Sequence, residues 1–318
     1  MGLSFVRIFA DNPHISVNTK WIENGVTVAG GNDKGSALNQ LSNPWGLWVD
    51  DDQTVYVADC QNYRIVEWKS GAMTGQVAAA GNGSGNNLNQ LNSTTDIILD
   101  KRNDYLIVND YGNKRVVRWP RQNGTTGEVI ISNVVCWSLA LDTNGDLYVS
   151  DYMKNEVKKW STGSTNGILV AGGNGPGNRL NQLNGRSYIY VDKDRSIYIS
   201  DEANHRVMKW IEGATEGIVV AGGHGQGSSR SHLWNPLGIA VDQLGTIYIA
   251  DSMNNRVMRW PKDAAEGSVV AGGNGQGIQA NQLYRPYGLR LDQHGNLYVV
   301  DNYNSRVQRF NVDSNSYR

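Results

Sequence analysis

Short runs in which apolar residues alternate with polar or small ones recur along the whole chain. In residues 236–251, for example, two such runs flank a Gly-containing turn. Period-two alternation rich in Val, Ile, Tyr and Trp is typical of half-buried β-strands. The 3.6-residue period of an amphipathic helix is missing from the sequence. The pattern therefore predicts an all-β fold of short antiparallel strands.

The strand pattern belongs to a repeated unit. Its most regular part is the motif Asp-x-x-Asn-x-Arg-Val/Ile-x-x-Trp. Two predicted strands come before this motif, and a run similar to Val-Val-Ala-Gly-Gly comes after it. Its copies are spaced by 51, 41, 50, 50 and 50 residues and begin at Asp59, Asp110, Asp151, Asp201, Asp251 and Asp301. Four strands per unit, repeated at such a period, predict the blades of a β-propeller.

The first strands of the units give the number of blades. Six are predicted, at residues 45–50, 95–100, 137–142, 187–192, 237–242 and 287–292. The last unit stops after its third strand, whereas residues 21–31 match a third-strand end and a complete fourth strand. We therefore expect the N-terminal segment to dock on the C-terminal blade, which removes two open sheet edges. This predicts a single propeller domain over residues 1–318.

The run Asn204-His205-Arg206-Val207 and its five relatives resemble the NHL repeat, and the resemblance covers most of the chain. It implies a six-bladed propeller. A Gly-rich segment, Ala-Gly-Gly-Asn-Gly-x-Gly…Asn-Gln-Leu, joins consecutive blades in five copies. It is missing before the third blade, which accounts for the 41-residue spacing. We expect these glycines to form crossovers between blades, because no helix follows them as in a phosphate-binding loop.

The Asp and Arg of the repeat lie on either side of one turn, and six copies indicate a scaffold rather than an active site. The Asn between them suits a left-handed or Asx-turn position. Glu156 departs from the series, since the other five blades carry Arg there.

The residues that face the propeller axis follow from the alternation along each first strand. The residues three and one before the closing Asp are always Leu, Ile or Val, so they should pack between blades and turn their neighbours toward the channel. The channel positions are Gly46/Trp48, Asp96/Ile98, Ser138/Ala140, Tyr188/Tyr190, Gly238/Ala240 and Gly288/Arg290.

The candidate ligand site combines the varied channel residues with tryptophans outside the repeated Trp column. Scaffold positions should look alike in every blade, whereas positions that meet a ligand are free to differ. We expect one pocket at the loop-rich mouth, and its ligand-binding residues are Trp48, Asp96, Tyr188, Tyr190, Arg290, Trp45, Trp137 and Trp234. The alternative interpretation is that these side chains fill the channel and pair with each other.

Metal chemistry has weak support in the sequence. His205, His224 and His232 fall in the fourth blade and its crossover, but their spacing matches no metal signature. Amidating lyases that resemble NHL propellers place metal-binding histidines at the axis, and gluconolactonase-like propellers place Glu, Asn and Asp there. The twelve channel positions hold no histidine and one carboxylate, so we expect no metal, no catalytic residue and no cofactor.

Composition limits the partners. The net charge is −1, so no global field attracts nucleic acid, and no apolar run reaches the ~18 residues of a membrane span. The N-terminus shows no signal-peptide pattern. We expect a soluble monomer in an undetermined compartment, with Cys60 and Cys136 as free thiols because a whole blade separates them.

The leading functional hypothesis is a non-catalytic recognition domain that binds a protein, small-molecule or glycan ligand on the loop-rich face. The first alternative is a lyase or hydrolase that uses Asp96, Tyr190 and Arg290 at the channel mouth. The second is single-stranded RNA binding, as in NHL domains of some tripartite-motif proteins. That mode needs clustered cations beside stacking aromatics, whereas Lys/Arg (29) and Asp/Glu (30) balance here.

Overall fold

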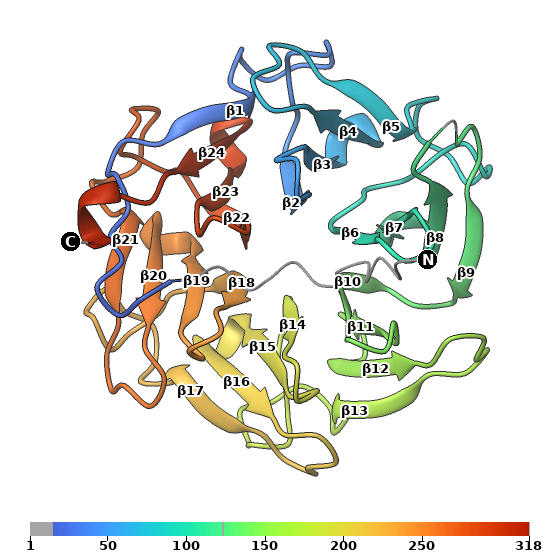
Figure 1. Ribbon diagram of the computed structural model, residues 1–318. Coiled ribbons are helices and arrows are strands. Elements are labelled where there is room, and N and C mark those ends of the chain that lie inside the picture. The colour runs from blue at the N-terminus through green and yellow to red at the C-terminus, as the bar shows by residue number, and fades with distance from the viewer. Residues whose placement is uncertain (1–14, 123, 318) are drawn as a thin grey trace, which may run out of the picture.

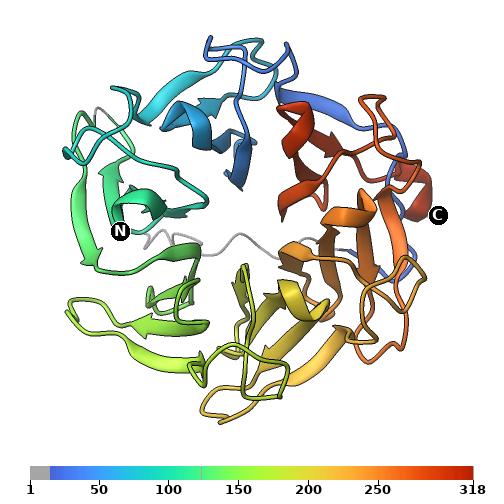
Figure 2. The ribbon, with the colours of Figure 1, turned by 180° about the vertical axis from the view of Figure 1, so that it is seen from behind.

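The computed structural model of the protein describes residues 15–122 and 124–317. Six four-stranded antiparallel sheets stand around a common axis as the blades of a propeller (Figures 1 and 2). The predicted six-bladed fold is therefore confirmed. The innermost strands of the blades are β2 (Pro44–Val49), β6 (Ile97–Asp100), β10 (Cys136–Leu141), β14 (Ile189–Val191), β18 (Pro236–Val241) and β22 (Pro286–Leu291).

The other three strands follow outward in chain order, as the alternation predicted, except that the outer strand of the last blade comes from the N-terminal segment. The second strands are β3 (Val55–Asp59), β7 (Tyr105–Asp110), β11 (Leu147–Asp151), β15 (Ile197–Asp201), β19 (Ile247–Asp251) and β23 (Leu297–Asp301). The third strands are β4 (Arg64–Trp68), β8 (Arg115–Pro120), β12 (Glu156–Trp160), β16 (Arg206–Trp210), β20 (Arg256–Trp260) and β24 (Arg306–Phe310). The outer strands are β5 (Gln76–Ala80), β9 (Glu128–Ser132), β13 (Ile168–Gly172), β17 (Ile218–Gly222), β21 (Ser268–Gly272) and β1 (Val26–Gly30).

The ring closes through the N-terminal segment. Strand β1 pairs antiparallel with β24 and completes the last blade, so this expectation is also confirmed (Figure 1). The segment before β1 adds further ties, since the Trp21 indole donates to the carbonyl of Gly295 at 2.9 Å. The guanidinium of Arg259 donates to the carbonyls of residues 16, 17 and 19.

In five of the six blades the Asp–Arg motif holds the blade to the crossover that precedes it. In the first blade, Asp59 accepts from Arg64 Nε at 2.8 Å and from the N–H of Ser42 at 2.7 Å. Arg64 also donates to the crossover carbonyls of Ala37 and Gln40. A buried carboxylate with these partners is a structural group, which supports the scaffold interpretation.

One detail of the motif differs from expectation. The left-handed residue is the one after the motif Asn, as at Tyr63 (φ 56°) in the first blade. Asn62 instead donates from its side chain to Asp59 and to the carbonyl of Gly35. The amide thus links the turn to the crossover, a role that requires the side chain rather than an unusual backbone angle.

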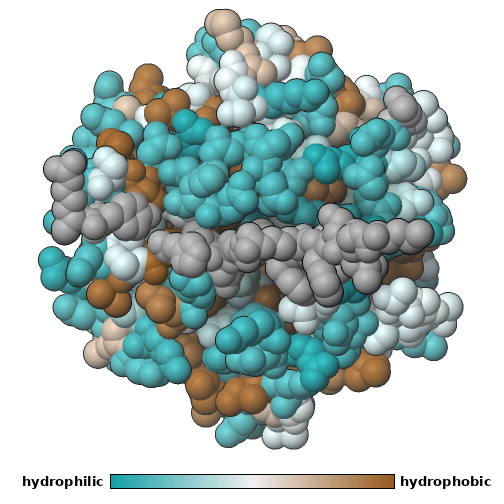
Figure 3. All heavy atoms as spheres, viewed as in Figure 1, coloured by the Kyte–Doolittle hydropathy of each residue, from teal (hydrophilic) through white to brown (hydrophobic). Residues whose placement is uncertain are grey.

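The core consists of packing between neighbouring blades. The third-strand aromatic column is buried in five blades, at 0–2% exposure for Trp68, Trp119, Trp210, Trp260 and Phe310. The surface differs by region: hydrophilic residues gather over the blades of β2 and β22, and apolar residues are scattered toward the rim (Figure 3). Among the residues that the structure describes, no helix is long and apolar enough to cross a membrane.

Candidate functional site

Close contacts between inner strands narrow the channel at its middle. This waist is formed by the first channel residue of each blade, and three of the six are glycines. A methyl group on Gly238 would lie 2.3 Å from the carbonyl oxygen of Tyr287, and one on Gly288 would lie 2.8 Å from that of Trp45. No side chain fits such spaces, so glycine lets the backbones of β18, β22 and β2 approach directly. The waist separates two ends of the channel.

Asp96 lies at this waist and is 2% exposed. Its carboxylate accepts from Ser138 Oγ at 2.7 Å and from the N–H groups of Leu139 and Ile97 at 3.0 and 2.9 Å. Burial raises the pKa of Asp96, and the positive charge of Arg290 opposes this rise. The carboxylate therefore ties β6 to β10 and is not presented to either end of the channel.

At one end of the channel the structure has a cavity of about 180 Å³. This is the end at which hairpin turns join the first and second strands, and we call the space the turn-end cavity. Its wall contains the second channel residue of every blade: Trp48, Ile98, Ala140, Tyr190, Ala240 and Arg290. The alternation along the first strands thus correctly predicted that these six residues face the same part of the channel.

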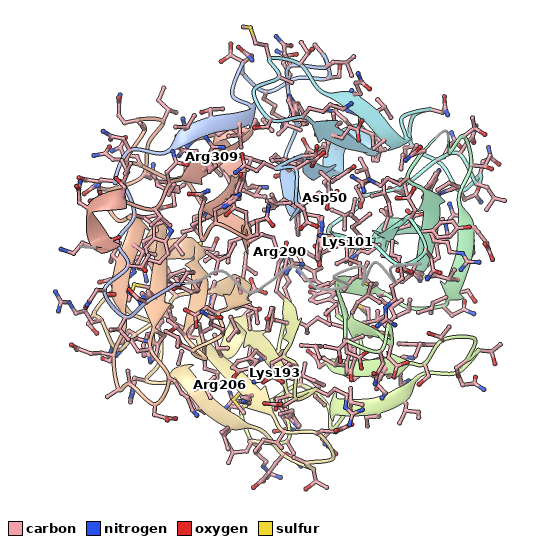
Figure 4. The ribbon with its side chains drawn as sticks, viewed as in Figure 1. Asp50, Lys101, Lys193, Arg206, Arg290 and Arg309 are labelled. Atoms are coloured by element: carbon pink, nitrogen blue, oxygen red, sulfur yellow. The ribbon has the colours of Figure 1, made fainter. Side chains whose placement is uncertain are left out.

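Arg290 is the cation of the turn-end cavity, and Figure 4 shows it near the axis of the ring. Its guanidinium carbon lies 5.2 Å from the ring centroid of Trp48, within cation–π range. None of the described residues forms a hydrogen bond or a close ion pair with this guanidinium. The nearby Asp50 is already paired with Lys101 at 3.2 Å and with Arg121.

The other polar groups of the cavity wall are less available. The Asp292 carboxylate accepts from N–H groups of its own turn, at His294 and Asn296, and from the Tyr298 hydroxyl. The Tyr190 ring packs at 6.2 Å from that of Tyr198. The indole N–H of Trp48 is buried without a hydrogen-bond partner among the described residues. A ligand oxygen would therefore meet Arg290 first.

Sequence reasoning missed part of this wall. The last aliphatic residue of five first strands also lines the cavity: Val49, Leu141, Val191, Val241 and Leu291. These positions were expected to pack between blades, and the corresponding Leu99 does so at 3% exposure. Because they end the strand just before its turn, one side of each residue faces the cavity. Their place at the strand end was the signal that could have shown this.

A different cluster of side chains lies at the opposite end, where crossovers enter the first strands. The Trp45 and Trp137 rings meet edge to face at 4.7 Å, and Tyr287 packs against Trp45 at 5.0 Å. Arg186 lies over both indoles, with centroid distances of 5.5 and 5.0 Å. Tyr188, at the waist, is 5% exposed and its buried hydroxyl has no partner among the described residues.

The structure brings only some of the candidate ligand-binding residues together. Trp48, Tyr190 and Arg290 line the turn-end cavity, whereas Trp45 and Trp137 lie beyond the waist. Asp96 and Tyr188 are buried between the two ends, and Trp234 lies in a crossover with its N–H bonded to Asp251. The two channel positions of each first strand face the same axis. The first of them lies at the waist, and the second lies nearer the turn end.

The three blade-four histidines are only partly brought together. The His224 and His232 rings are 5.8 Å apart, and His205 accepts from the N–H of Asn235 at 3.3 Å. Within residues 15–122 and 124–317, no group of three or more His, Cys, Asp or Glu side chains could hold a metal ion. Cys60 and Cys136 are both buried and free, so the thiol prediction is confirmed.

The ring of six blades with a cavity at one end of its axis defines a six-bladed β-propeller. Three segments, residues 41–68, 233–259 and 283–310, match the model of the NHL repeat. The chain is therefore a six-bladed β-propeller that contains NHL repeats. Comparison with curated protein sequences gives no significant match.

Solved structures share the fold at low sequence identity. A structural genomics protein of unknown function from Bacteroides thetaiotaomicron is 18% identical, with a TM-score of 0.73 over 91% of this chain and 76% of that one. An auxiliary nutrient binding protein from the same organism is 14% identical, with a TM-score of 0.69 over 96% and 75%. Virginiamycin B lyase from Staphylococcus aureus is 10% identical, with a TM-score of 0.53 over 88% and 98%. These likenesses concern the fold alone.

Proposed function

We propose that this propeller is a recognition protein that binds a small organic anion in the turn-end cavity. The observation that carries the proposal is Arg290, a guanidinium at the wall of an otherwise largely apolar cavity, stacked on Trp48 and with no hydrogen-bonding partner among the described residues. Concave, mostly apolar sites with a few oriented polar groups are typical of small-molecule sites.

The size of the cavity limits the ligand. A dry cavity of about 150 Å³ is large enough for benzene. The 180 Å³ of the turn-end cavity therefore suits one ring with a short substituent, and a larger ligand would extend into solvent. The aliphatic strand ends would contact the faces of such a ring, and Arg290 would receive its carboxylate in a paired, charge-assisted hydrogen bond.

Recognition fits the described groups better than catalysis does. The enzyme hypothesis assigned a role to Asp96, but its carboxylate accepts three hydrogen bonds at the waist. Asp292 is likewise engaged by its own turn. A general acid or base needs a carboxyl group within reach of the ligand, and neither of these is free to serve. RNA binding would need a row of cations, whereas Lys101 beside the mouth is paired with Asp50 and Asp51.

The nutrient-binding neighbour is consistent with a binding role and the lyase neighbour with a catalytic one, so the fold does not choose between them. The choice rests on the cavity wall. A ligand-binding propeller needs a pocket and an orienting polar group. The turn-end cavity supports this role, because its wall includes Arg290, which has no hydrogen-bonding partner among the described residues.

The proposal is tested by calorimetric titration with benzoate and cyclohexanecarboxylate, using benzamide as the neutral control. We expect the two carboxylates to bind and the amide to bind at least about tenfold more weakly, since the guanidinium interaction is lost. Arg290→Gln should remove the preference for the anion, and Trp48→Leu should weaken all three probes. Both variants should keep the circular dichroism of the parent.

Lys193→Gln provides the matched control, because Lys193 is an exposed cation in the turn after β14, two blades away from Arg290 (Figure 4). It removes the same charge without touching the cavity wall. Carboxylate binding that survives in Arg290→Gln, or that falls equally in Lys193→Gln, would place the anion site elsewhere. A chain that binds none of the carboxylates at millimolar concentration would contradict the proposal.

A further inference from the structure

The junction between the second and third blades lacks a part that the other five junctions share. Each of those five has a Gly-rich crossover that ends in a fully buried leucine: Leu41, Leu91, Leu183, Leu233 and Leu283, all at 0% exposure. Between β9 and β10 only residues 133–135 connect the blades. At five junctions, therefore, a Gly-rich crossover fills the space that its absence leaves open between the second and third blades.

Each crossover is held by a hydrogen bond from a glycine that precedes an outer strand. Gly75 donates to the carbonyl of Leu38, and Gly127 to that of Leu88, both at 2.7 Å. Gly217, Gly267 and Gly25 make the same bond in the other three blades. Gly167 is the equivalent residue of the third blade, and its N–H has no such partner among the described residues.

The Arg position of the motif also changes in this blade. The five arginines of the other blades donate to crossover carbonyls, as Arg206 does to Asn178 and Arg179. Glu156 stands in this place, directly opposite Asp151 in the strand register. One Glu156 oxygen is buried without a hydrogen bond, although the Lys158 ammonium lies 2.9 Å from it. Among the described residues, the counter-charge of Asp151 is the more exposed Lys154, at 3.9 Å.

The space left by the missing crossover is a groove of about 430 Å³. Its apolar wall includes Ile130, Val134 and Trp160. Its polar wall includes the paired groups Glu156 with Lys158 and Asp151 with Lys154, together with Gly167. Trp160 is half-buried, whereas the five other aromatic residues of its column are buried. We call this space the blade-3 groove.

We infer that the blade-3 groove binds an extended segment of a partner polypeptide in which a basic residue stands next to an apolar one. Its backbone carbonyl would accept from Gly167, its apolar side chain would cover Trp160, and its basic side chain would approach Glu156 and Asp151. The charge is the reverse of that at the other junctions, where the blade supplies Arg and the crossover supplies acceptors. A crossover of the chain's usual kind therefore fits less well than a segment that brings its own cation.

The kind of partner can be inferred from the groups in the groove that have no hydrogen-bonding or packing partner. It needs one carbonyl acceptor, one apolar contact and one donor for a carboxylate, and a short peptide segment offers all three at successive positions. The wall holds two carboxylates, Asp151 and Glu156, each beside one lysine, Lys154 and Lys158, so it offers no cluster of unpaired cations to a membrane or a nucleic acid. The inference is independent of the turn-end cavity, because the groove lies at the outer part of the second and third blades.

The test uses fluorescein-labelled peptides that copy residues 171–184, a crossover that already carries one basic residue, Arg179. A second peptide carries Glu at that position. Fluorescence anisotropy is measured with the whole chain at peptide and protein concentrations up to the millimolar range. We expect the Arg peptide to bind about tenfold more tightly than the Glu peptide, and Glu156→Arg to abolish or reverse this preference.

Two further variants make the result specific. Glu216→Arg, an exposed change of the same charge on the fourth blade, should leave the preference unchanged. A filled variant, with a copy of residues 173–182 inserted between Asn133 and Val134, should bind both peptides at least about tenfold more weakly. Its circular dichroism and thermal unfolding show whether it folds, and Trp160→Ala gives a second test at the apolar wall.

Preference for the Arg peptide that Glu156→Arg removes, together with loss of binding in the filled variant, supports the inference. It is overturned if the Arg peptide does not bind at millimolar concentration. Equal binding by the filled variant and the parent, or equal effects of Glu156→Arg and Glu216→Arg, also overturns it.

Discussion

At the residue scale, the height of a side chain along the channel decides what it does. Asp96 and Arg290 both face the axis, yet Asp96 is enclosed at the waist while Arg290 lines the turn-end cavity. The carboxylate is surrounded by donors, so it stabilises the fold. The guanidinium rests on an indole and keeps its donors, so it can orient a ligand.

We predict that Asp96→Ala destabilises the protein by about 2–5 kcal/mol. The change leaves Ser138 Oγ and the N–H of Leu139 buried without their acceptor, and each unsatisfied group costs roughly 1–3 kcal/mol. Urea unfolding monitored by tryptophan fluorescence measures the difference. A loss below about 0.5 kcal/mol, the range of neutral surface changes, would mean that the carboxylate does not tie the two blades.

The two cysteines give a prediction on pH. Burial raises the pKa of the Cys60 thiol to about 12 and that of Cys136 well above its usual range. Thiolate is the reactive form, so neither residue should react with a disulfide reagent in the native protein at pH 8, and both should react after denaturation. Because the folded state keeps these protons longer than the unfolded state, unfolding free energy should fall as pH rises above the ordinary thiol pKa. Fast reaction of either cysteine with the reagent in the native protein would show that its thiol is not buried.

At the scale of elements, the unit of the architecture is a blade joined to the crossover before it. In five blades the motif Arg bonds to the Asp of its own blade and to carbonyls of the crossover, so it holds the two together. The third blade supports this rule, because it lacks the crossover and has Glu156 in place of the Arg. Without carbonyls to bind, a buried guanidinium there would be left unsatisfied.

We predict that Arg206→Ala costs about 3–5 kcal/mol, because it leaves Asp201 as a buried charge without its cation. Glu156→Ala, at the same motif position, should cost less than about 1 kcal/mol, since Glu156 holds no crossover and its ion pair is partly exposed. Chemical denaturation of the two variants provides the comparison. Equal losses of unfolding free energy in the two variants would show that the crossover contacts of Arg206 do not contribute to stability.

At the scale of the whole molecule, stability depends on closing the ring. Deleting residues 1–31 removes β1 and leaves the edge of β24 open, so the truncated chain should aggregate or melt at a clearly lower temperature. Size-exclusion chromatography with light scattering and calorimetry measure both effects. A synthetic peptide of residues 15–31 added in trans should restore part of the loss. A truncated chain that stays monodisperse with an unchanged melting temperature would contradict this role of β1.

The sequence predicted the ring because the repeat states its own period. Six motif copies fix the number of blades, and the unmatched strand at residues 26–30 fixes the closure. The site was predicted only in part, because alternation tells which side chains face the axis but not at what height. The waist depends on contacts of Gly238 and Gly288 with the backbones of other blades, and those distances have no local signature. The blade-3 groove was visible only as a shorter spacing and an unusual Glu.

We propose that the turn-end cavity holds a small organic anion against Arg290. The most direct measurement is a crystal structure of the protein soaked with 4-bromobenzoate, whose bromine marks its position by anomalous scattering. We predict the ring among Trp48 and the aliphatic strand ends, with its carboxylate hydrogen-bonded to the Arg290 guanidinium. An empty turn-end cavity, or a ligand bound only beyond the waist at Trp45 and Arg186, would contradict the account.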